Sequence, residues 1–169
     1  MLICEATRDL PVAEVAVRTP LEATTGHRLK HELVLVPVLR AGLGMMSGIL
    51  QFLPGARVGF IGLRRDESTL QPVAYHDSVP ARLGDAEVIV IDPMLATGGS
   101  SLAALDLLHG RGARRVRLIN LVSCPEGVRA VRQRYPKLPL FTASIDRELN
   151  GKGYILPGLG DAGDRLFHA

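Results

Sequence analysis

The stretch "VIVIDPMLATGGSS", Val88 to Ser101, decides the fold class of this chain. Its first four residues are branched and apolar, which is typical of a strand that is buried on both faces. The run ends on one acid, Asp92, and passes through small residues into the helical pattern "LAALDLLHG". A buried strand that leads directly into a helix predicts a βαβ unit.

The small-residue turn permits two interpretations. Its Ser and Thr residues can simply cap the following helix. Alternatively, a helix N-terminus with free N–H groups and little side-chain bulk can bind an anion, and Thr97 and Ser100 would add hydroxyl donors. The Lys that an ATPase phosphate-binding loop carries before its Ser or Thr is missing here. We therefore expect the anion to be a part of the substrate by which the protein holds it, and not a group that is transferred.

Strand and helix patterns alternate along the rest of the chain. Strands are predicted for "ELVLVPVL" (32–39), "ARVGFIGL" (56–63), "EVIVID" (87–92), "RVRLINLVS" (115–123) and the shorter "LPLFTAS" (138–144). Helices are predicted for "GLGMMSGILQFL" (42–53), "GGSSLAALDLLHGRG" (98–112) and "PEGVRAVRQRY" (125–135). This alternation predicts an α/β fold with a mostly parallel sheet flanked by helices, in which ligands bind beyond the carboxyl ends of the strands. The long irregular stretches 64–87 and 146–169 are predicted to be lids or binding loops.

Composition places the chain among globular proteins. Its 169 residues and 47% hydrophobic content suit one domain, 1–169, with a sizeable core. No apolar run is long enough for a membrane span, the start does not resemble a signal peptide, and Cys4 and Cys124 are too few for a disulfide framework, so we expect a cytoplasmic protein. His27 and His31 lack a third metal ligand nearby and are expected on an exposed helical face.

Arg dominates the 20 basic residues, and the net charge is +3. Arg binds phosphate groups through two parallel hydrogen bonds. The basic cluster "RGARRVRLIN" (111–120) is interpreted as the solvated start of a strand, with a nucleic-acid contact as the alternative.

A second alternative concerns Gly42-Leu43-Gly44, which resembles the opening of a dinucleotide-binding fingerprint. Asp66 or Glu67 would then lie at a suitable distance to contact a ribose. The next glycine, however, is spaced one residue too far, and Arg40 occupies the position of the short turn.

Taken in order, five strings carry a resemblance: "VPVLRAGLGMMSG", "VGFIGLRRDEST", "DPMLATGGSS", "LVSCPEG" and "GYILPGLGDAGDR". Together they closely resemble the uracil phosphoribosyltransferase family over nearly the whole chain. The resemblance implies the type I phosphoribosyltransferase fold with a C-terminal hood at roughly 144–169. It also implies transfer of the phosphoribosyl group of 5-phosphoribosyl 1-pyrophosphate to uracil, giving UMP and pyrophosphate. The alternative is a non-catalytic or bifunctional nucleotide-sensing regulator that binds RNA on the same fold.

The resemblance also assigns residues. Arg40, Arg65 and Asp92 match the family's catalytic positions, with the two arginines on the pyrophosphate side. The phosphoribosyl pyrophosphate site would consist of Arg40, Arg65, Asp92, Pro93, Met94, Leu95, Ala96, Thr97, Gly98, Gly99, Ser100 and Asp161. The uracil site would consist of Ile155, Gly160, Asp161 and Ala162, acting largely through the backbone. Mg²⁺ is expected on the pyrophosphate oxygens, with Asp161 as the candidate protein contact.

Further expectations from the resemblance are a homodimer or higher homo-oligomer, activation by GTP, and neither membrane nor nucleic-acid partners. Two departures stand out. Relatives carry a helical segment before the part that matches "ICEATRDL". If such a segment belongs to this protein as well, apolar surface near Leu2 and Ile3 is expected to be left uncovered here. Relatives also have an aromatic residue where this chain has Arg64, which bears on how Arg65 is presented.

Overall fold

The computed structural model describes residues 1–65 and 72–168, and of Arg65 and Pro72 the backbone only. Within these residues the largest sheet has eight strands. They are β3 (Leu33–Leu39), β4 (Arg57–Val58), β5 (Ile61–Arg65), β6 (Pro72–Asp77), β7 (Glu87–Ile91), β8 (Met94–Leu95), β9 (Arg115–Ser123) and β10 (Leu140–Ile145). The order is β10-β9-β7-β3-β5-β6, and every neighbouring pair on this path is parallel except β5 with β6.

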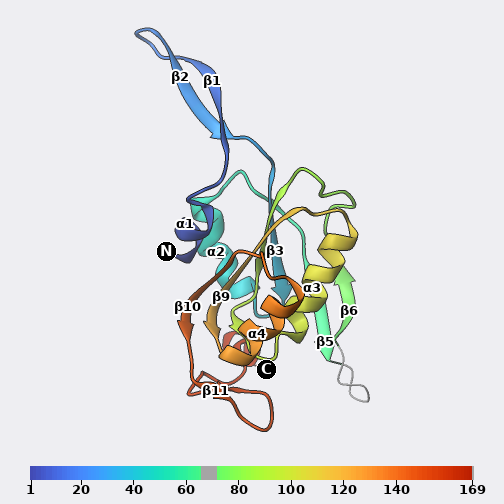
Figure 1. Cartoon of the computed structure of the whole chain (residues 1–169). Coiled ribbons are helices and arrows are strands. Elements are labelled where there is room, and N and C mark those ends of the chain that lie inside the picture. The colour runs from blue at the N-terminus through green and yellow to red at the C-terminus, as the bar shows by residue number, and fades with distance from the viewer. Residues whose placement is uncertain (66–71, 169) are drawn as a thin grey trace.

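Helices cover both faces of this sheet (Figure 1). They are α1 (Leu2–Thr7), α2 (Leu43–Phe52), α3 (Gly99–Gly110), α4 (Pro125–Arg134) and α5 (Ala162–Phe167). Alternate strand residues point to opposite faces. Val88 and Val90 of β7 therefore share one core with α3 and α4, whereas Ile89 and Ile91 share the other with α1 and α2. A strand with a core on each face must be apolar throughout, which explains the unbroken run in the sequence.

The chain reverses its direction of progress across the sheet at β3. From β3 it goes to β5 and β6 on one side, and then returns to place β7, β9 and β10 on the other side. The loops that follow β3 and β7 therefore leave the sheet in opposite directions and create a crevice at the carboxyl ends. The fold thus predicts a ligand site between the segment after Leu39 and the segment after Ile91.

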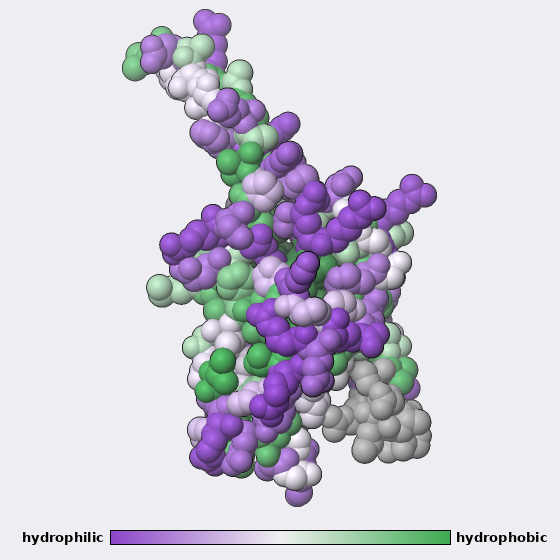
Figure 2. All heavy atoms as spheres, in the orientation of Figure 1, coloured by the Kyte–Doolittle hydropathy of each residue, from purple (hydrophilic) through white to green (hydrophobic). Residues whose placement is uncertain are grey.

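A two-stranded arm projects from the body. Strands β1 (Val12–Arg18) and β2 (Ala23–Leu29) pair with each other in antiparallel register, with Val12 opposite Leu29. Figure 1 shows this ribbon extending away from the sheet, and Figure 2 shows green apolar side chains among the purple polar ones along it. Leu21 at its turn is 96% exposed.

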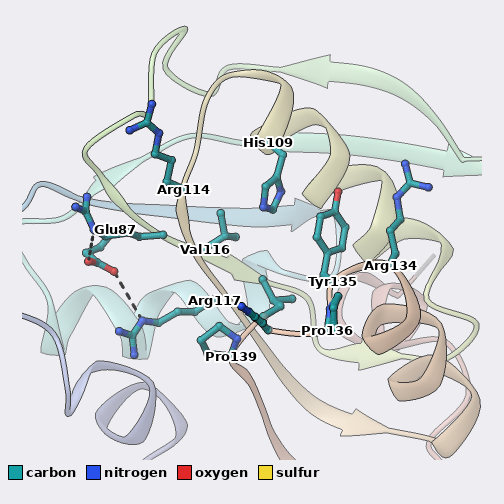
Figure 3. Close-up of a pocket in the computed structure, with 12 residues that line it drawn as sticks. Glu87, His109, Arg114, Val116, Arg117, Arg134, Tyr135, Pro136 and Pro139 are labelled. Atoms are coloured by element: carbon teal, nitrogen blue, oxygen red, sulfur yellow. Dashed lines mark ion pairs between the residues drawn. The ribbon is translucent and has the colours of Figure 1, made fainter.

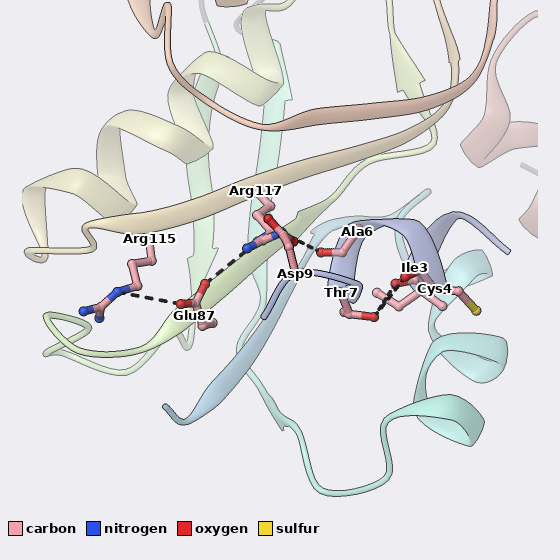
Figure 4. A network of polar contacts seen from close by, with 8 residues as sticks. All are labelled: Ile3, Cys4, Ala6, Thr7, Asp9, Glu87, Arg115 and Arg117. Atoms are coloured by element: carbon pink, nitrogen blue, oxygen red, sulfur yellow. Dashed lines mark hydrogen bonds and ion pairs between the residues drawn. The ribbon is translucent and has the colours of Figure 1, made fainter. Parts of the chain in front are cut away.

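A polar network connects helix α1 and the residue Asp9 that follows it to strands β9 and β7 (Figure 4). Arg117, buried on β9, donates to the carbonyl of Ala6 over 3.1 Å and forms an ion pair with Asp9. Its guanidinium holds the pKa of Asp9 below the usual value. Glu87 lies between Arg115 and Arg117, with N···O distances of 3.7 and 3.8 Å. At the start of the chain, Ile3 is buried in one core with residues of α2 and β9, whereas Leu2 is partly exposed.

The structure confirms the predicted α/β fold, with differences in detail. The predicted strand 56–63 is divided into β4 and β5, and the stretch predicted as irregular, 64–87, contains β6. The second irregular stretch contains the short hairpin β11 (Glu148–Leu149) and β12 (Ile155–Leu156) and helix α5. His27 lies on strand β2 and not on a helix. Among the described residues, no helix is long and apolar enough to span a membrane.

Candidate active site

The crevice at the carboxyl ends holds a cavity of about 370 Å³. One wall is the segment that follows β7, and the other is the hairpin β11–β12 with the start of α5. The residues that line it are Asp92, Met94, Ala96, Thr97, Gly98, Gly99, Ser100, Ser101, Lys152, Gly153, Tyr154, Ile155, Gly160, Asp161 and Ala162. Segments about 60 residues apart in sequence thus meet beyond the carboxyl end of β7, whereas the segment after Leu39 contributes no lining residue.

The wall after β7 is shaped as an anion cradle. Gly98 adopts a left-handed conformation, φ +85°, and serves as the N-cap of α3. The hydroxyl of Thr97 accepts from the N–H of Gly99 over 3.3 Å. The N–H groups of Ser100 and Ser101 meet no acceptor within the described chain, and they begin a helix of 12 residues. Unpaired amides at the positive end of a helix that line a cavity suit a phosphate group.

Asp92 is held at the base of the cradle. Its backbone carbonyl accepts from the side-chain amide of Asn120 over 2.6 Å, and its carboxylate accepts from Ser101 Oγ over 3.3 Å. The N–H of Met94 donates to the other carboxylate oxygen over 3.4 Å. Burial raises the pKa of Asp92 to about 6, although these hydrogen bonds act in the opposite direction. The carboxylate is therefore poised to change charge near neutral pH.

Two residues predicted for the phosphoribosyl pyrophosphate site lie behind the cavity wall. Leu95 is fully buried in the core, and Pro93 is buried as well. The carbonyl of Pro93 accepts from Leu121 and Val122, and the carbonyl of Leu95 accepts from Cys124. These residues connect the cradle to β9 and α4 and support its shape.

Helix α4 supports both walls. Gly127 is packed so closely that an added Cβ would lie 2.6 Å from the carbonyl oxygen of Leu95 and closer still to that of Ala96. The Cys124 thiol lies 3.1 Å from the Ala96 carbonyl oxygen. Glu126 Oε1 accepts from the N–H of Leu149, on the hairpin of the opposite wall, over 3.3 Å. One helix thus fixes the cradle relative to the hairpin.

The predicted uracil residues come together on that opposite wall. Ile155 is buried on β12, paired with Leu149. Gly160 has φ +79° and precedes Asp161, which caps α5 by accepting from the N–H of Asp164 over 2.9 Å. Ile155, Gly160, Asp161 and Ala162 all line the cavity. A segment with this much exposed backbone can hydrogen-bond the edge of a flat ring.

The predicted arginines are placed differently. Arg40 follows β3 through a cis peptide bond with Leu39, and its exposed guanidinium lies 3.5 Å from Asp164. It sits beside the crevice and not among the lining residues of the cavity. Arg65 is the last residue of β5, and its side chain is outside the described part of the structure, as are Asp66 and Glu67. Arg64 is exposed.

The acids of the site fit a magnesium ion that is held mainly by its substrate. Asp92 and Asp161 present carboxylates to one cavity, and carboxylate oxygen is the donor type that Mg²⁺ prefers. Among residues 1–65 and 72–168, three or more His, Cys, Asp or Glu side chains are nowhere clustered as a metal cage. Any ion here would complete its shell with substrate oxygens and water.

A larger cavity, of about 470 Å³, lies at the amino ends of β7 and β9, on the side of the sheet away from the carboxyl ends (Figure 3). Its cations are largely committed within the chain: Arg115 and Arg117 reach Glu87, and Arg134 pairs with Asp106 over 2.7 Å. The rings of His109 and Tyr135 stack on each other with centroids 4.6 Å apart. The basic cluster 111–120 is thus split between exposed and internally paired side chains. The cavity at the carboxyl ends is therefore the candidate active site.

Sequence reasoning missed several residues of the site. Ser101, Lys152, Gly153 and Tyr154 line the cavity without having been predicted as binding residues. Asn120 was missed as well, although a polar amide in the apolar run "RVRLINLVS" is a signal that could have revealed it. Gly153 and Tyr154 begin the string "GYILPGLGDAGDR" that carries the resemblance, although neither was assigned a contact. Lys152 carries no such signal, because only the folded hairpin brings it to the cavity.

Comparison with known proteins agrees with this geometry. The family model described as uracil phosphoribosyltransferase matches residues 1–169. The chain is 53% identical over 168 residues to a uracil phosphoribosyltransferase of Symbiobacterium thermophilum, and 51% identical over 167 residues to one of Acholeplasma laidlawii. Each alignment covers 99% of this chain and 80% of the relative.

Solved structures extend the comparison. The AQ2163 protein of Aquifex aeolicus superposes with a TM-score of 0.92 at 40% identity, covering 99% of this chain and 80% of that chain. A hypoxanthine-guanine phosphoribosyltransferase of Bacillus anthracis superposes with a TM-score of 0.55 at 17% identity, covering 74% of this chain and 63% of that one. At that identity the second likeness shows a shared fold.

Proposed function

The chain belongs to the uracil phosphoribosyltransferase family, and from that premise we propose that it joins uracil to 5-phosphoribosyl 1-pyrophosphate, giving UMP and pyrophosphate. The observation that carries this proposal is the cavity at the carboxyl ends. It combines an anion cradle, a buried acid and a backbone-rich wall within about 370 Å³. The comparisons give no support to the alternative of a non-catalytic regulator or to dinucleotide binding.

In the proposed reaction, N1 of uracil forms a bond to the anomeric carbon of the ribose while the bond from that carbon to pyrophosphate breaks. The N1 proton is released, and positive charge develops on the ribose ring in the transition state. The cradle from Thr97 to Ser100 would bind the 5′-phosphate, and the Asp92 carboxylate would accept a hydrogen bond from a ribose hydroxyl. These groups act by orientation and electrostatics.

The leaving pyrophosphate is assigned to Arg40 and Arg65. Bidentate guanidinium contacts suit a group that gains negative charge as it departs. Arg40 stands at the crevice and is loosely paired with Asp164, so a pyrophosphate can compete for it. When bound, Mg²⁺ neutralises pyrophosphate charge, and Asp161 is the protein residue proposed to hold it.

Uracil is assigned to the wall formed by Ile155, Gly160, Asp161 and Ala162. We propose that this wall is the inner face of a hood, roughly 144–169, which belongs to a single domain, 1–169. The hydrogen bonds from Leu149 to Glu126 and from the N–H of Asp146 to the carbonyl of Ser123 support a hood fixed to the rest of the domain.

An assay with uracil and 5-phosphoribosyl 1-pyrophosphate tests the function directly. We expect UMP and pyrophosphate in equal amounts, and we expect chelation of Mg²⁺ to abolish their formation. Absence of UMP at saturating substrates and Mg²⁺ would contradict the proposal.

We propose a homo-oligomer, with the arm β1–β2 as the contact between copies. An isolated two-stranded ribbon is marginally stable in water, and this one leaves Val12, Val17 and Leu29 40–55% exposed. Light scattering during size-exclusion chromatography tests it. Val17→Glu is expected to reduce the mass to that of one chain, whereas Glu14→Gln on the same strand should leave it unchanged.

Two further expectations concern regulation and location. Activation by GTP stays a prediction, and adding GTP to the UMP assay tests it. The cytoplasm is proposed as the location because both thiols, Cys4 and Cys124, are unpaired.

A further inference from the structure

The hairpin turn between β11 and β12 is organised by one side chain. Asn150 Oδ1 accepts from the N–H of Lys152 over 2.9 Å and from the N–H of Tyr154 over 3.0 Å. The backbone N–H of Asn150 donates to the carbonyl of Tyr154, and that of Gly153 donates to the carbonyl of Asn150. Gly153 has φ +81°, which closes the turn without steric cost. The turn therefore has a defined shape.

This turn faces the anion cradle. An ideal Cβ on Gly153 would lie 3.6 Å from the methyl group of Thr97. Lys152, Gly153 and Tyr154 line the same cavity as the cradle. The two walls thus come into van der Waals range beside the position proposed for the 5′-phosphate.

The cavity is lined by more acidic than basic side chains, although its proposed ligand carries negative phosphate groups. Asp92 and Asp161 are acids, and Lys152 is the one Lys or Arg among the described lining residues. Throughout residues 1–65 and 72–168, no ion pair links Lys152 to a carboxylate. A phosphate in the cradle would otherwise be bound by amide and hydroxyl groups beside carboxylates, so an uncommitted ammonium there has a clear electrostatic role.

We propose that Lys152 is a further substrate-binding residue, whose ammonium contacts the 5′-phosphate from the wall opposite the cradle, and that Asn150 is the residue that positions it. The inference rests on the proposed function, because it assigns a contact to the same substrate. It links the hood to the phosphate end of the substrate as well as to the base.

The first test compares Lys152→Ala, Lys152→Arg and Lys152→Glu. We expect Lys152→Ala to raise the KM for 5-phosphoribosyl 1-pyrophosphate about tenfold, the effect of losing one charge-assisted hydrogen bond. Lys152→Glu should raise it further, and Lys152→Arg should restore most of the loss. The KM for uracil should change little. Lys137→Ala, in the cavity at the amino ends of β7 and β9, is the matched control and should behave like the wild type.

Direct binding separates this contact from catalysis. Titration calorimetry with ribose 5-phosphate, which lacks the pyrophosphate and the base, should show the same tenfold loss in Lys152→Ala. The affinity of Lys152→Ala should also depend less on salt, because one ion pair is gone.

A double-mutant cycle tests the role of Asn150. Asn150→Ala should raise the same KM in the wild type and raise it little further in Lys152→Ala, because Asn150 acts through Lys152. Asn150→Asp keeps an acceptor oxygen for both N–H groups and should recover part of the affinity, limited by the negative charge that it adds near the phosphate. Additive losses would overturn the positioning role.

The two proposals fail in different ways. If the wild type makes no UMP, the proposed function is wrong. If the wild type makes UMP while Lys152→Ala and Lys152→Glu keep the wild-type KM and ribose 5-phosphate affinity, the assignment of Lys152 is wrong.

Discussion

Ser101 donates its hydroxyl to Asp92 across 3.3 Å, and both residues are buried. This hydrogen bond favours the ionised carboxylate, whereas burial disfavours it and raises the pKa of Asp92 to about 6. The first residues of α3 thus tune the charge of the acid that ends β7.

Replacing Ser101 by Ala should therefore shift the pH dependence of activity. Without the hydroxyl, the pKa of Asp92 rises further, so the acid limb of kcat/KM for 5-phosphoribosyl 1-pyrophosphate moves to higher pH. The phosphates of the substrate titrate identically for both enzymes, so the difference between the profiles reports the protein. Ser100 is the control, because its hydroxyl does not contact Asp92. Ser100→Ala should lower the affinity for 5-phosphoribosyl 1-pyrophosphate without shifting the acid limb of the pH profile. Superimposable Ser101→Ala and wild-type profiles would count against this role.

Asp92→Asn should make the protein more stable and less active. The folded-state pKa of about 6 lies above the ordinary value of 3.8, so the folded chain binds a proton more tightly than the unfolded chain. Ionisation of Asp92 therefore destabilises the fold above pH 6, by ~3 kcal/mol for a shift of about two units. Denaturant unfolding of the two proteins should show this difference at neutral pH, and the difference should vanish as the pH falls through about 6 to 4. If the difference in the free energy of unfolding stayed constant across this pH range, ionisation of Asp92 would not be its cause.

The two glycines of the cradle should respond differently to a methyl group. Gly98→Ala forces a side chain into a left-handed conformation, and its Cβ would lie 3.2 Å from that of Ala130. We expect a loss of about 1–2 kcal/mol, or roughly 2–4 °C in Tm for each kcal/mol. Gly99→Ala has space behind it, with Thr97 Oγ1 at 3.6 Å, so it should keep its Tm and raise the KM for 5-phosphoribosyl 1-pyrophosphate. Equal Tm values for both variants would show that the strain is not at Gly98.

Arg65→Ala should reduce kcat by roughly a hundredfold, the scale of losing one preorganised donor to a developing charge. Its neighbour Arg64, which is exposed, is the matched control and should lose much less. Steady-state kinetics of the two variants decide the matter. Comparable losses would mean that the wrong arginine has been assigned to the pyrophosphate.

Base choice should follow the hydrogen-bonding edge of the ring. Cytosine has an acceptor at N3 and a donor at position 4, where uracil has the reverse, so fixed backbone groups at Ile155, Gly160 and Ala162 would leave buried polar groups unpaired. Each mismatch costs on the order of 1–3 kcal/mol, so two would discriminate by roughly 10²- to 10⁴-fold. 5-Fluorouracil keeps the edge of uracil and should be accepted. Relative kcat/KM values measure this, and cytosine turned over within tenfold of uracil would exclude a backbone-read site.

The sequence was most informative where local pattern and global fold agree. The run from Val88 to Ile91 predicted a strand with two buried faces, and the structure places a core on each side of it. The small residues from Ala96 to Ser100 predicted the cradle, because a helix N-terminus is a local feature. Strand β9 matches its predicted range, 115–123.

What the sequence did not reveal depends on contacts between distant segments. Strands β1 and β2 lack a buried face, so the apolar alternation that identifies a strand is weak there. Asp161 and Asp92 are 69 positions apart, and only the fold makes them neighbours of one cavity. The roles of Leu95 and Pro93 as internal supports likewise follow from burial, which a matching string of letters does not report.

The close approach of α4 to the cradle has a consequence for any survey of this enzyme by mutation. The absence of a side chain at Gly127 lets the helix rest against the carbonyl oxygens of Leu95 and Ala96. A screen that removes polar groups one at a time would pass over this position, since it has nothing to remove. A screen that adds atoms should rank it among the most sensitive sites, although it does not line the cavity. A position of this chain can therefore be intolerant to substitution for either of two reasons. At some positions the side chain supplies a chemical group, and its removal causes the loss of activity. At others, such as Gly127, the added atoms cause the loss because they change the shape of the site.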